Sequence, residues 1–236
     1  MFFFTKKSHS FSLTDLLGFD FKKIDFESIF PFESYATTSL AVATCQEQPG
    51  KLMLLNDWQG SRDPIFAQLL SNKRSELHAA IHQQNSSVQI EGAWAKDAAT
   101  SDDFIHVNSN MPMSDVFDDV FQSHVRQRRP ILVNMERSTL LNDKPSRLSA
   151  LLVRDAFFHV NFLSLSGHYG ETAKRVAFRL LHAGRVAYLG FEMDDFVVIA
   201  KGKKTELSES VFALLADQSK KRIKASMCVD ELPLGG

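Results

Sequence analysis

The order of the predicted elements between Val153 and Val229 constrains the fold more strongly than any other feature of the chain. Apolar runs separated by turn residues predict strand, helix, strand, strand, helix and strand in this stretch. This order is that of the split βαβ, or ferredoxin-like, unit. The predicted segments are 156–163, 171–183, 185–191, 196–200, 205–216 and 223–229. We therefore expect residues 153–229 to form one ferredoxin-like unit.

The part of the chain before this unit repeats the order of elements without repeating the sequence. After a strand at 35–44, the repeated segments are 51–55, 63–83, 88–94, 103–107, 114–125 (a helix that Ser114 is predicted to cap) and 131–135. The sequence thus predicts an α+β protein with two ferredoxin-like units in tandem, an acidic one over 36–136 and a basic one over 153–229, joined by a connector at 137–152. The alternative is a single doubly wound α/β sheet, in which Ile131, Phe158 and Val186 belong to successive parallel strands.

The first 35 residues are unusually aromatic, because nine of the twenty phenylalanines lie between Phe2 and Phe32. Burial of aromatic surface is favourable, so a segment of this kind is not expected to remain in solvent. We interpret residues 1–35 as a Phe-rich strap that lies over the body of the chain, with a partner-binding arm as the alternative. Residues 230–236 are interpreted as a short C-terminal tail.

The composition is that of an ordinary globular protein, with 44% hydrophobic and 23% charged residues. No apolar run approaches the length of a membrane span. In Met1–Lys7 the apolar residues come before the lysines, which is the reverse of a secretory signal. Cys45 and Cys228 are far apart, so the sequence indicates neither a disulfide framework nor a zinc site. We therefore expect a cytoplasmic protein with no membrane contact, no metal and no cofactor.

Charge is distributed unevenly along the chain, although the net charge is only −1. Residues 1–123 contain nine Lys and Arg against sixteen Asp and Glu, whereas residues 124–225 contain eighteen against ten. A basic half is typical of proteins that bind a polyanion, because Lys and Arg neutralise phosphates and release counterions. The predicted nucleic-acid-binding residues form four clusters, which are Arg126, Arg128 and Arg129; Lys174, Arg175 and Arg179; Lys201, Lys203 and Lys204; and Lys220, Lys221 and Arg222.

Two short resemblances accompany this interpretation. Phe157–Phe162 (FFHVNF) resembles the first-strand motif of RNA-recognition modules, with an aromatic at its second position and Asn at its fifth, while Asp194–Ile199 lacks their third-strand signature. Val153–Gly190 resembles the C-terminal portion of the CRISPR repeat-associated proteins in its strand, helix and Tyr-Leu-Gly order. The first resemblance implies stacking of single-stranded RNA bases on strand aromatics. The second implies tandem ferredoxin-like units and, for some members of that family, metal-independent cleavage of RNA.

Cleavage of that kind requires a general acid and base, most simply histidine, beside a cation. The candidates are His159, His168 and His182, and their alternative roles are a packed strand residue, a turn residue and a charge near a helix C-terminus. The sequence contains no GxGxxG, P-loop, GxSxG or HExxH motif. The leading interpretation is therefore a non-catalytic nucleic-acid-binding component, with single-stranded RNA preferred over DNA as the partner. The alternatives are a protein-interaction adaptor, which meets an acidic partner or docks through the Phe-rich strap, and a metal-independent endoribonuclease.

Overall fold

The structure is a computed structural model of the whole chain. It describes residues 10–12, 20, 23–29, 38–43, 51–56, 64–94, 102–107, 111–142, 144–192, 195, 206–208 and 214. The strands are β1 (Ser10–Ser12), β2 (Thr38–Ala43), β3 (Lys51–Asn56), β4 (Gln89–Trp94), β5 (Asp102–His106), β6 (Arg129–Val133), β7 (Phe157–Asn161), β8 (Val186–Glu192) and β9 (Glu206–Ser208). The helices are α2 (Phe26–Ile29), α3 (Pro64–His82), α4 (Met113–Val125), the 3-10 helix η3 (Met135–Arg137), α5 (Thr139–Asn142), α6 (Pro145–Val153), α7 (Phe162–Ser166) and α8 (Glu171–His182).

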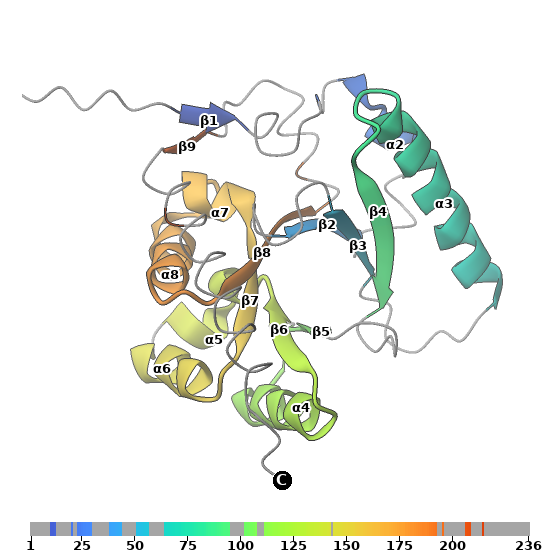
Figure 1. Cartoon of the computed structure of the whole chain (residues 1–236). Helices are drawn as coiled ribbons and strands as arrows, with labels where there is room; N and C mark the ends of the chain where they lie inside the picture. Colours follow the sequence, from blue (N-terminus) through green and yellow to red (C-terminus); the bar gives the residue numbers. More distant parts are fainter. Residues whose placement is uncertain are drawn as a thin grey trace, which may run out of the picture.

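A seven-stranded sheet in the order β4-β3-β2-β8-β7-β6-β5 forms the centre of the described fold (Figure 1). The strands β5, β6, β7 and β8 are parallel to one another. β2 runs antiparallel to both of its neighbours, β8 and β3, while β3 and β4 are parallel. β1 and β9 form a separate antiparallel pair. The chain is therefore an α/β protein whose sheet contains four consecutive parallel strands.

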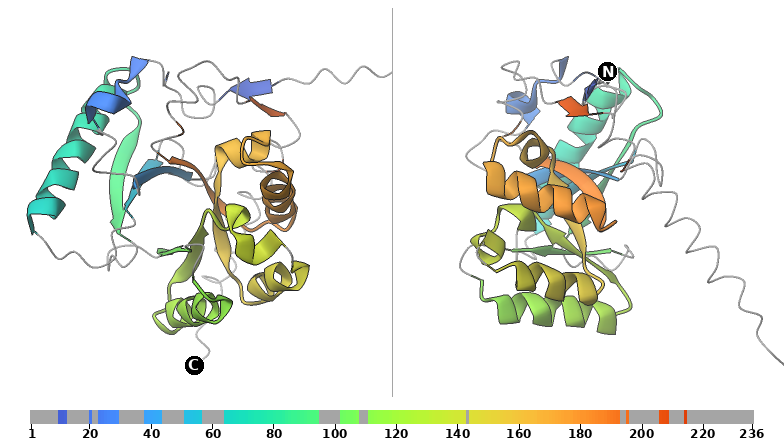
Figure 2. Two further views of the ribbon diagram at one scale, coloured as in Figure 1. Left: turned by 180° about the vertical axis from the view of Figure 1, so that it is seen from behind. Right: turned by 90° about the vertical axis from the view of Figure 1, so that its left-hand side faces the viewer.

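Helices connect the parallel strands and cover one face of this part of the sheet. Side chains on that face, such as Leu132 and Phe158, belong to the same buried cluster as Val120 of α4 and Leu180 of α8. Alternate strand residues point to the opposite face, where Phe104, Ile131, Val133, Ala187 and Tyr188 form a second cluster that contains no residue of a described helix. In Figure 2 the green, yellow and orange helices α4, α6 and α8 lie stacked beside one another along the sheet.

The predicted pairing of the strands is wrong. The tandem ferredoxin-like units are overturned because β6 and β7 pair directly in one parallel sheet, across the predicted connector at 137–152. The predicted hairpin between 88–94 and 103–107 does not form, since β4 and β5 lie at opposite edges of the sheet. β8 pairs with β7 on one side and with β2 on the other, and residues 196–200, its predicted hairpin partner, lie outside the described residues. The alternative, a single α/β sheet, describes the class of the fold, although the helices that follow β5, β6 and β7 cover one face of it and not two.

The predicted elements themselves are largely confirmed, and α8 follows its sequence pattern closely. Its buried residues Ala173, Val176, Ala177, Leu180 and Leu181 are the apolar face that the sequence indicates. The backbone at Gly184 has a φ of 70°, which is the left-handed conformation that glycine adopts readily after a helix. α8 ends at His182, within one residue of the predicted end of this helix.

Two boundaries differ from the prediction. α4 begins at Met113 after Pro112, so Ser114 is not its cap, and the Ser114 hydroxyl donates to the Asp115 carboxylate at 3.0 Å. The predicted strand 156–163 ends at Asn161, where α7 begins. The Asn161 side chain caps α7 by accepting a hydrogen bond from the backbone N–H of Leu163 at 2.8 Å.

Several predictions fall outside the described residues. These are the strands at 196–200 and 223–229, the tail at 230–236, and the strap at 1–35 apart from residues 10–12, 20 and 23–29. Residues 206–208 form the strand β9, although a helix is predicted over 205–216. Among the helices that the structure describes, none has the length and apolar character needed to cross a bilayer. The cytoplasmic location stays a prediction.

Candidate active site

Polar side chains gather where the parallel strands β6, β7 and β8 end. Asn134 follows β6 directly and has a left-handed backbone, with a φ of 53°, which turns the chain into η3. Asn161 is the last residue of β7 and Glu192 is the last of β8. Ligand sites of open α/β sheets lie outside the carboxyl ends of their parallel strands. This edge is therefore the candidate active site.

Glu136 is the most deeply buried acid of the site, with no solvent exposure. Its Oε1 atom accepts hydrogen bonds from the Asn161 backbone N–H at 3.0 Å and from the Ser164 hydroxyl at 2.7 Å. Its Oε2 atom has no hydrogen-bond partner among the described residues. Burial raises the pKa of Glu136, and the nearby Arg137 charge offsets only part of that effect. Burial therefore favours the protonated form of this carboxyl group.

Arg137 and Asn134 together hold the carboxylate of Glu192. The amide Nδ2 of Asn134 donates to Glu192 Oε1 at 2.9 Å, Nη1 of Arg137 donates to Oε2 at 3.1 Å, and Nη2 of Arg137 donates to Oε1. Burial acts to lower the pKa of Arg137, but the bonds and charge of Glu192 outweigh it and raise the pKa. The side chains of Arg137 and Glu192 are 20% and 32% exposed, so this contact reaches the surface. We call the three donors of Asn134 and Arg137 the anion cradle.

Asp195 is the second buried acid of the site, and three donors converge on it. Tyr169 donates its hydroxyl to Oδ1, while Asn161 Nδ2 and the Glu192 backbone N–H each donate to Oδ2 at 2.7 Å. Burial raises the pKa of Tyr169, and the hydrogen bond to Asp195 adds to the rise. Asn161 therefore links both acids, because its backbone N–H binds Glu136 and its side chain binds Asp195.

The three candidate histidines are not brought together as an acid and base. His159 is fully buried in β7, and neither of its ring nitrogens has a hydrogen-bond partner among the described residues. Burial, together with the charges of His106 and Arg137, lowers the pKa of His159 to about 3. His168 is exposed in the turn before α8, and its ring is nearly perpendicular to that of Tyr169, with the two ring centres 5.1 Å apart. His182 is exposed at the opposite end of α8.

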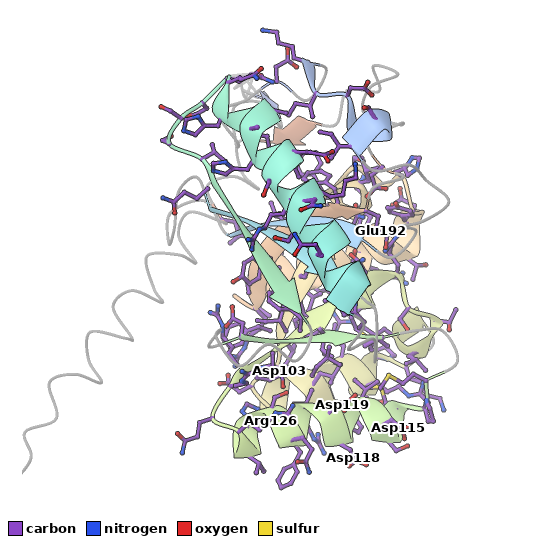
Figure 3. All side chains as sticks on the ribbon, turned by 90° about the vertical axis from the view of Figure 1, so that its right-hand side faces the viewer. Asp103, Asp115, Asp118, Asp119, Arg126 and Glu192 are labelled. Carbon is purple, nitrogen blue, oxygen red and sulfur yellow. The ribbon has the colours of Figure 1, made fainter. Side chains whose placement is uncertain are left out.

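The first predicted basic cluster is neutralised by two buried aspartates at the amino ends of the strands. Arg126 and Arg128 form ion pairs with Asp103, and Arg129 donates two hydrogen bonds to Asp102, at 2.7 and 2.8 Å. Asp102 also accepts a hydrogen bond from the Tyr188 hydroxyl at 2.7 Å. Figure 3 places Asp103 and Arg126 well away from Glu192. These arginines stabilise the fold and take no part in the candidate active site.

The other basic clusters do not complete a binding surface in the part of the chain that the structure describes. Arg175 and Arg179 are exposed on α8, and Lys174 is half-buried there. Lys201, Lys203, Lys204, Lys220, Lys221 and Arg222 lie outside the described residues.

The sequence-based prediction names none of the residues that form this site. The missing residues are Asn134, Glu136, Arg137, Asn161, Glu192 and Asp195, and a signal for them is present in the sequence. Asn134, Asn161 and Glu192 each follow an apolar run, and parallel strands bring the ends of such runs to one edge. The alternative of a single doubly wound sheet, with its parallel strands, therefore predicts that these residues lie close together, whereas the tandem prediction does not.

No protein-family model matches the chain, and no curated protein matches it. The chain is similar to a solved structure described in a report on YwqE from Bacillus subtilis and CpsB from Streptococcus pneumoniae as unique metal-dependent tyrosine phosphatases. The sequences are 12% identical, the match covers 65% of this chain and 72% of that chain, and the TM-score is 0.42. No residue role is carried over at this level of likeness. Within the described ranges, no group of three or more His, Cys, Asp or Glu side chains is arranged to hold a metal ion.

The prediction of a non-catalytic nucleic-acid-binding component is corrected by these findings. Stacking of RNA bases required an open ferredoxin-like sheet, whereas Phe158 is fully buried under helices in a parallel sheet. Arg126, Arg128 and Arg129 are engaged with Asp102 and Asp103. The metal-independent endoribonuclease is set aside with it, because the three histidines do not converge. The Phe-rich strap of the adaptor alternative lies largely outside the described residues, so docking through it stays a prediction.

Proposed function

We propose that the chain is an enzyme, a hydrolase that cleaves a small ester carrying an anionic group. One observation carries the proposal. The anion cradle converges on a carboxylate that is one third exposed, and Arg137 of the cradle is next in sequence to Glu136. Glu136 is a buried acid with a raised pKa, and its Oε2 atom has no hydrogen-bond partner among the described residues. Charge-assisted donors of this kind recognise carboxylates and phosphates, and a buried acid with a raised pKa is typical of a general acid.

In this proposal the anionic group of the substrate replaces the carboxylate of Glu192 in the anion cradle. Water attacks the central atom of the ester, and the bond to the leaving oxygen breaks. The proton held by Glu136 passes to that oxygen, while the proton lost by the water passes to Asp195. Asn161 keeps both acids in place through its two hydrogen bonds. The positive charge of Arg137 compensates the charge that develops on the substrate.

Replacing Glu136 with glutamine is expected to lower kcat for ester hydrolysis by about 100-fold or more, because general acid catalysis supplies a factor of this order. Glutamine keeps the size of the side chain but has no proton to give to the leaving oxygen. The measurement is release of phenol from phenyl phosphate, because the basic phenolate needs a proton in order to leave, whereas p-nitrophenolate does not. The matched control is Asp155→Asn, an exposed acid that pairs with Arg185 just before the amino ends of β7 and β8, at the opposite end of these strands from the site. Equal rates for wild type and Glu136→Gln would contradict the assignment of the acid.

Replacing Arg137 with lysine is expected to raise KM for the anionic p-nitrophenyl phosphate by about tenfold, because lysine does not reproduce a bidentate guanidinium contact. The KM for the neutral p-nitrophenyl acetate is expected to stay within about twofold of the wild-type value, since that ester makes no contact of this kind. Initial rates at varied substrate concentration separate the two effects. A similar rise for both esters would show that Arg137 supports the fold of the site and does not select an anion.

A further inference from the structure

The outer surface of α4, together with the end of α6, leaves three large apolar side chains in solvent. Phe121, Val125 and Val153 are 62%, 60% and 85% exposed. A hydrogen bond between the His124 ring and the Arg154 carbonyl, at 2.8 Å, holds the neighbouring residues of the two helices together. The Arg154 guanidinium also lies over the Phe117 ring, 4.3 Å from its centre. Val125 is next in sequence to His124 and Val153 is next to Arg154, so each valine adjoins one partner of this hydrogen bond. We call the side chains of Phe121, Val125 and Val153 the α4 patch.

The α4 patch is continuous with an acidic stretch of the same helix. Asp115 and Asp118 are exposed, and the spacing from Asp118 to Phe121 and on to Val125 places all of these residues on one side of α4. Figure 3 shows Asp115 and Asp118 along the outer side of the helix. Neither aspartate has an ion-pair partner among the described residues. An acid near a helix N-terminus stabilises the helix, which explains the presence of Asp115. It does not explain why Phe121 of the same helix is exposed.

The positive charges beside this surface are already engaged. Arg126, at the end of α4, forms an ion pair with Asp103, and Arg154 is stacked on Phe117. The outer face of α8 differs, since it presents Arg175 and Arg179 and no large exposed apolar side chain. The combination of acidic and apolar groups is therefore a property of α4 and is not repeated on α8.

We propose that the α4 patch with Asp115 and Asp118 docks a basic amphipathic helix of a partner protein. The apolar side of such a helix covers Phe121, Val125 and Val153, and its Lys or Arg residues meet the two aspartates. Docking of a helix through apolar residues spaced three and four apart is a common mode of peptide recognition. The opposite charges orient the partner and speed its association. This inference does not depend on the proposed hydrolase activity.

The test uses the full chain and a fluorescein-labelled helical peptide of eighteen residues, with Leu on one side and Lys on the other. In fluorescence anisotropy we expect this peptide to bind, and the double variant Phe121→Ser/Val125→Ser to bind at least tenfold more weakly. Asp115→Asn/Asp118→Asn is expected to weaken binding several-fold and to reduce its dependence on salt. The matched control is Arg175→Ala/Arg179→Ala on α8, for which the affinity is expected to be unchanged.

The substituted side chains are exposed, so we expect the variants to keep the wild-type Tm to within about 2 °C. Three results would overturn the proposal. The first is equal affinity for a peptide with Glu in place of Lys. The second is peptide binding that the Phe121→Ser/Val125→Ser variant leaves unchanged. The third is dimerisation of the wild type in sedimentation velocity that this variant abolishes, because the patch would then bind a second copy of the chain.

Discussion

Replacing Gly190 with alanine is expected to lower the free energy of unfolding by about 3 kcal/mol, the upper range for an overpacked core. A Cβ atom at Gly190 would lie 1.7 Å from Nε2 of the fully buried His159 ring. The backbone at Gly190 cannot move away from the ring, because Gly190 pairs with Ala41 of β2 on one side and with Asn161 of β7 on the other. Urea denaturation of the wild type and the variant measures the difference.

The double variant His159→Ala/Gly190→Ala provides the control for this expectation. Removal of the ring removes the clash, so the Gly190→Ala substitution is expected to cost less than about 1 kcal/mol in the His159→Ala background. A cost that is the same in both backgrounds would mean that the ring of His159 is not the source of the strain.

Acid is expected to destabilise the protein through His159, by about 2 kcal/mol between pH 7 and pH 5. In the folded chain, burial and the nearby His106 and Arg137 lower the pKa of His159 to about 3. In the unfolded chain the ring has its ordinary pKa of about 6.5 and binds a proton below that pH. The unfolded state therefore binds more protons between pH 6.5 and pH 3, and the free energy of unfolding falls by about 1.4 kcal/mol per pH unit in that window.

Urea denaturation at pH 7 and pH 5 measures this effect, with His159→Phe as the matched variant. Phenylalanine keeps a planar ring and does not titrate, so its loss of stability over the same interval is expected to be smaller by about 2 kcal/mol. Equal losses in wild type and variant would assign the acid sensitivity to other groups. An NMR titration of the folded protein adds an independent check, because a His159 ring that titrates near pH 6.5 would contradict its depressed pKa.

Local sequence patterns predicted most of the described helices and strands, but they did not predict which strands pair. The run at 186–191 is apolar at nearly every position, which is equally consistent with a hairpin strand and with the interior of a parallel sheet. Its actual neighbours are β7 and β2. β2 lies more than a hundred residues away in sequence from β8, and no local turn signal reports such a contact.

The candidate active site was missed for the same reason. Glu192 meets Asn134 and Arg137 across 58 and 55 residues of sequence, and Asn161 meets Glu136 across 25. These residues converge only if β6, β7 and β8 run in the same direction. The tandem prediction assigns β6 to a different unit from β7 and β8, so it does not bring Glu136 to Asn161 or Arg137 to Glu192. The histidines were chosen as candidates because histidine is a common general acid and base. The residues of the site are defined instead by their place at the carboxyl ends of β6, β7 and β8.

The strand β2, which runs antiparallel to both of its neighbours, lies between two parts of the seven-stranded sheet. Every backbone contact in the seven-stranded sheet between β3 and β4 on one side and the four parallel strands on the other passes through β2. The candidate active site belongs entirely to the parallel side, since its residues come from segments that adjoin β6, β7 and β8. Opening of the sheet at β2 would therefore separate β3 and β4 from the four parallel strands, while Glu136, Arg137 and Asp195 would remain together on the parallel side.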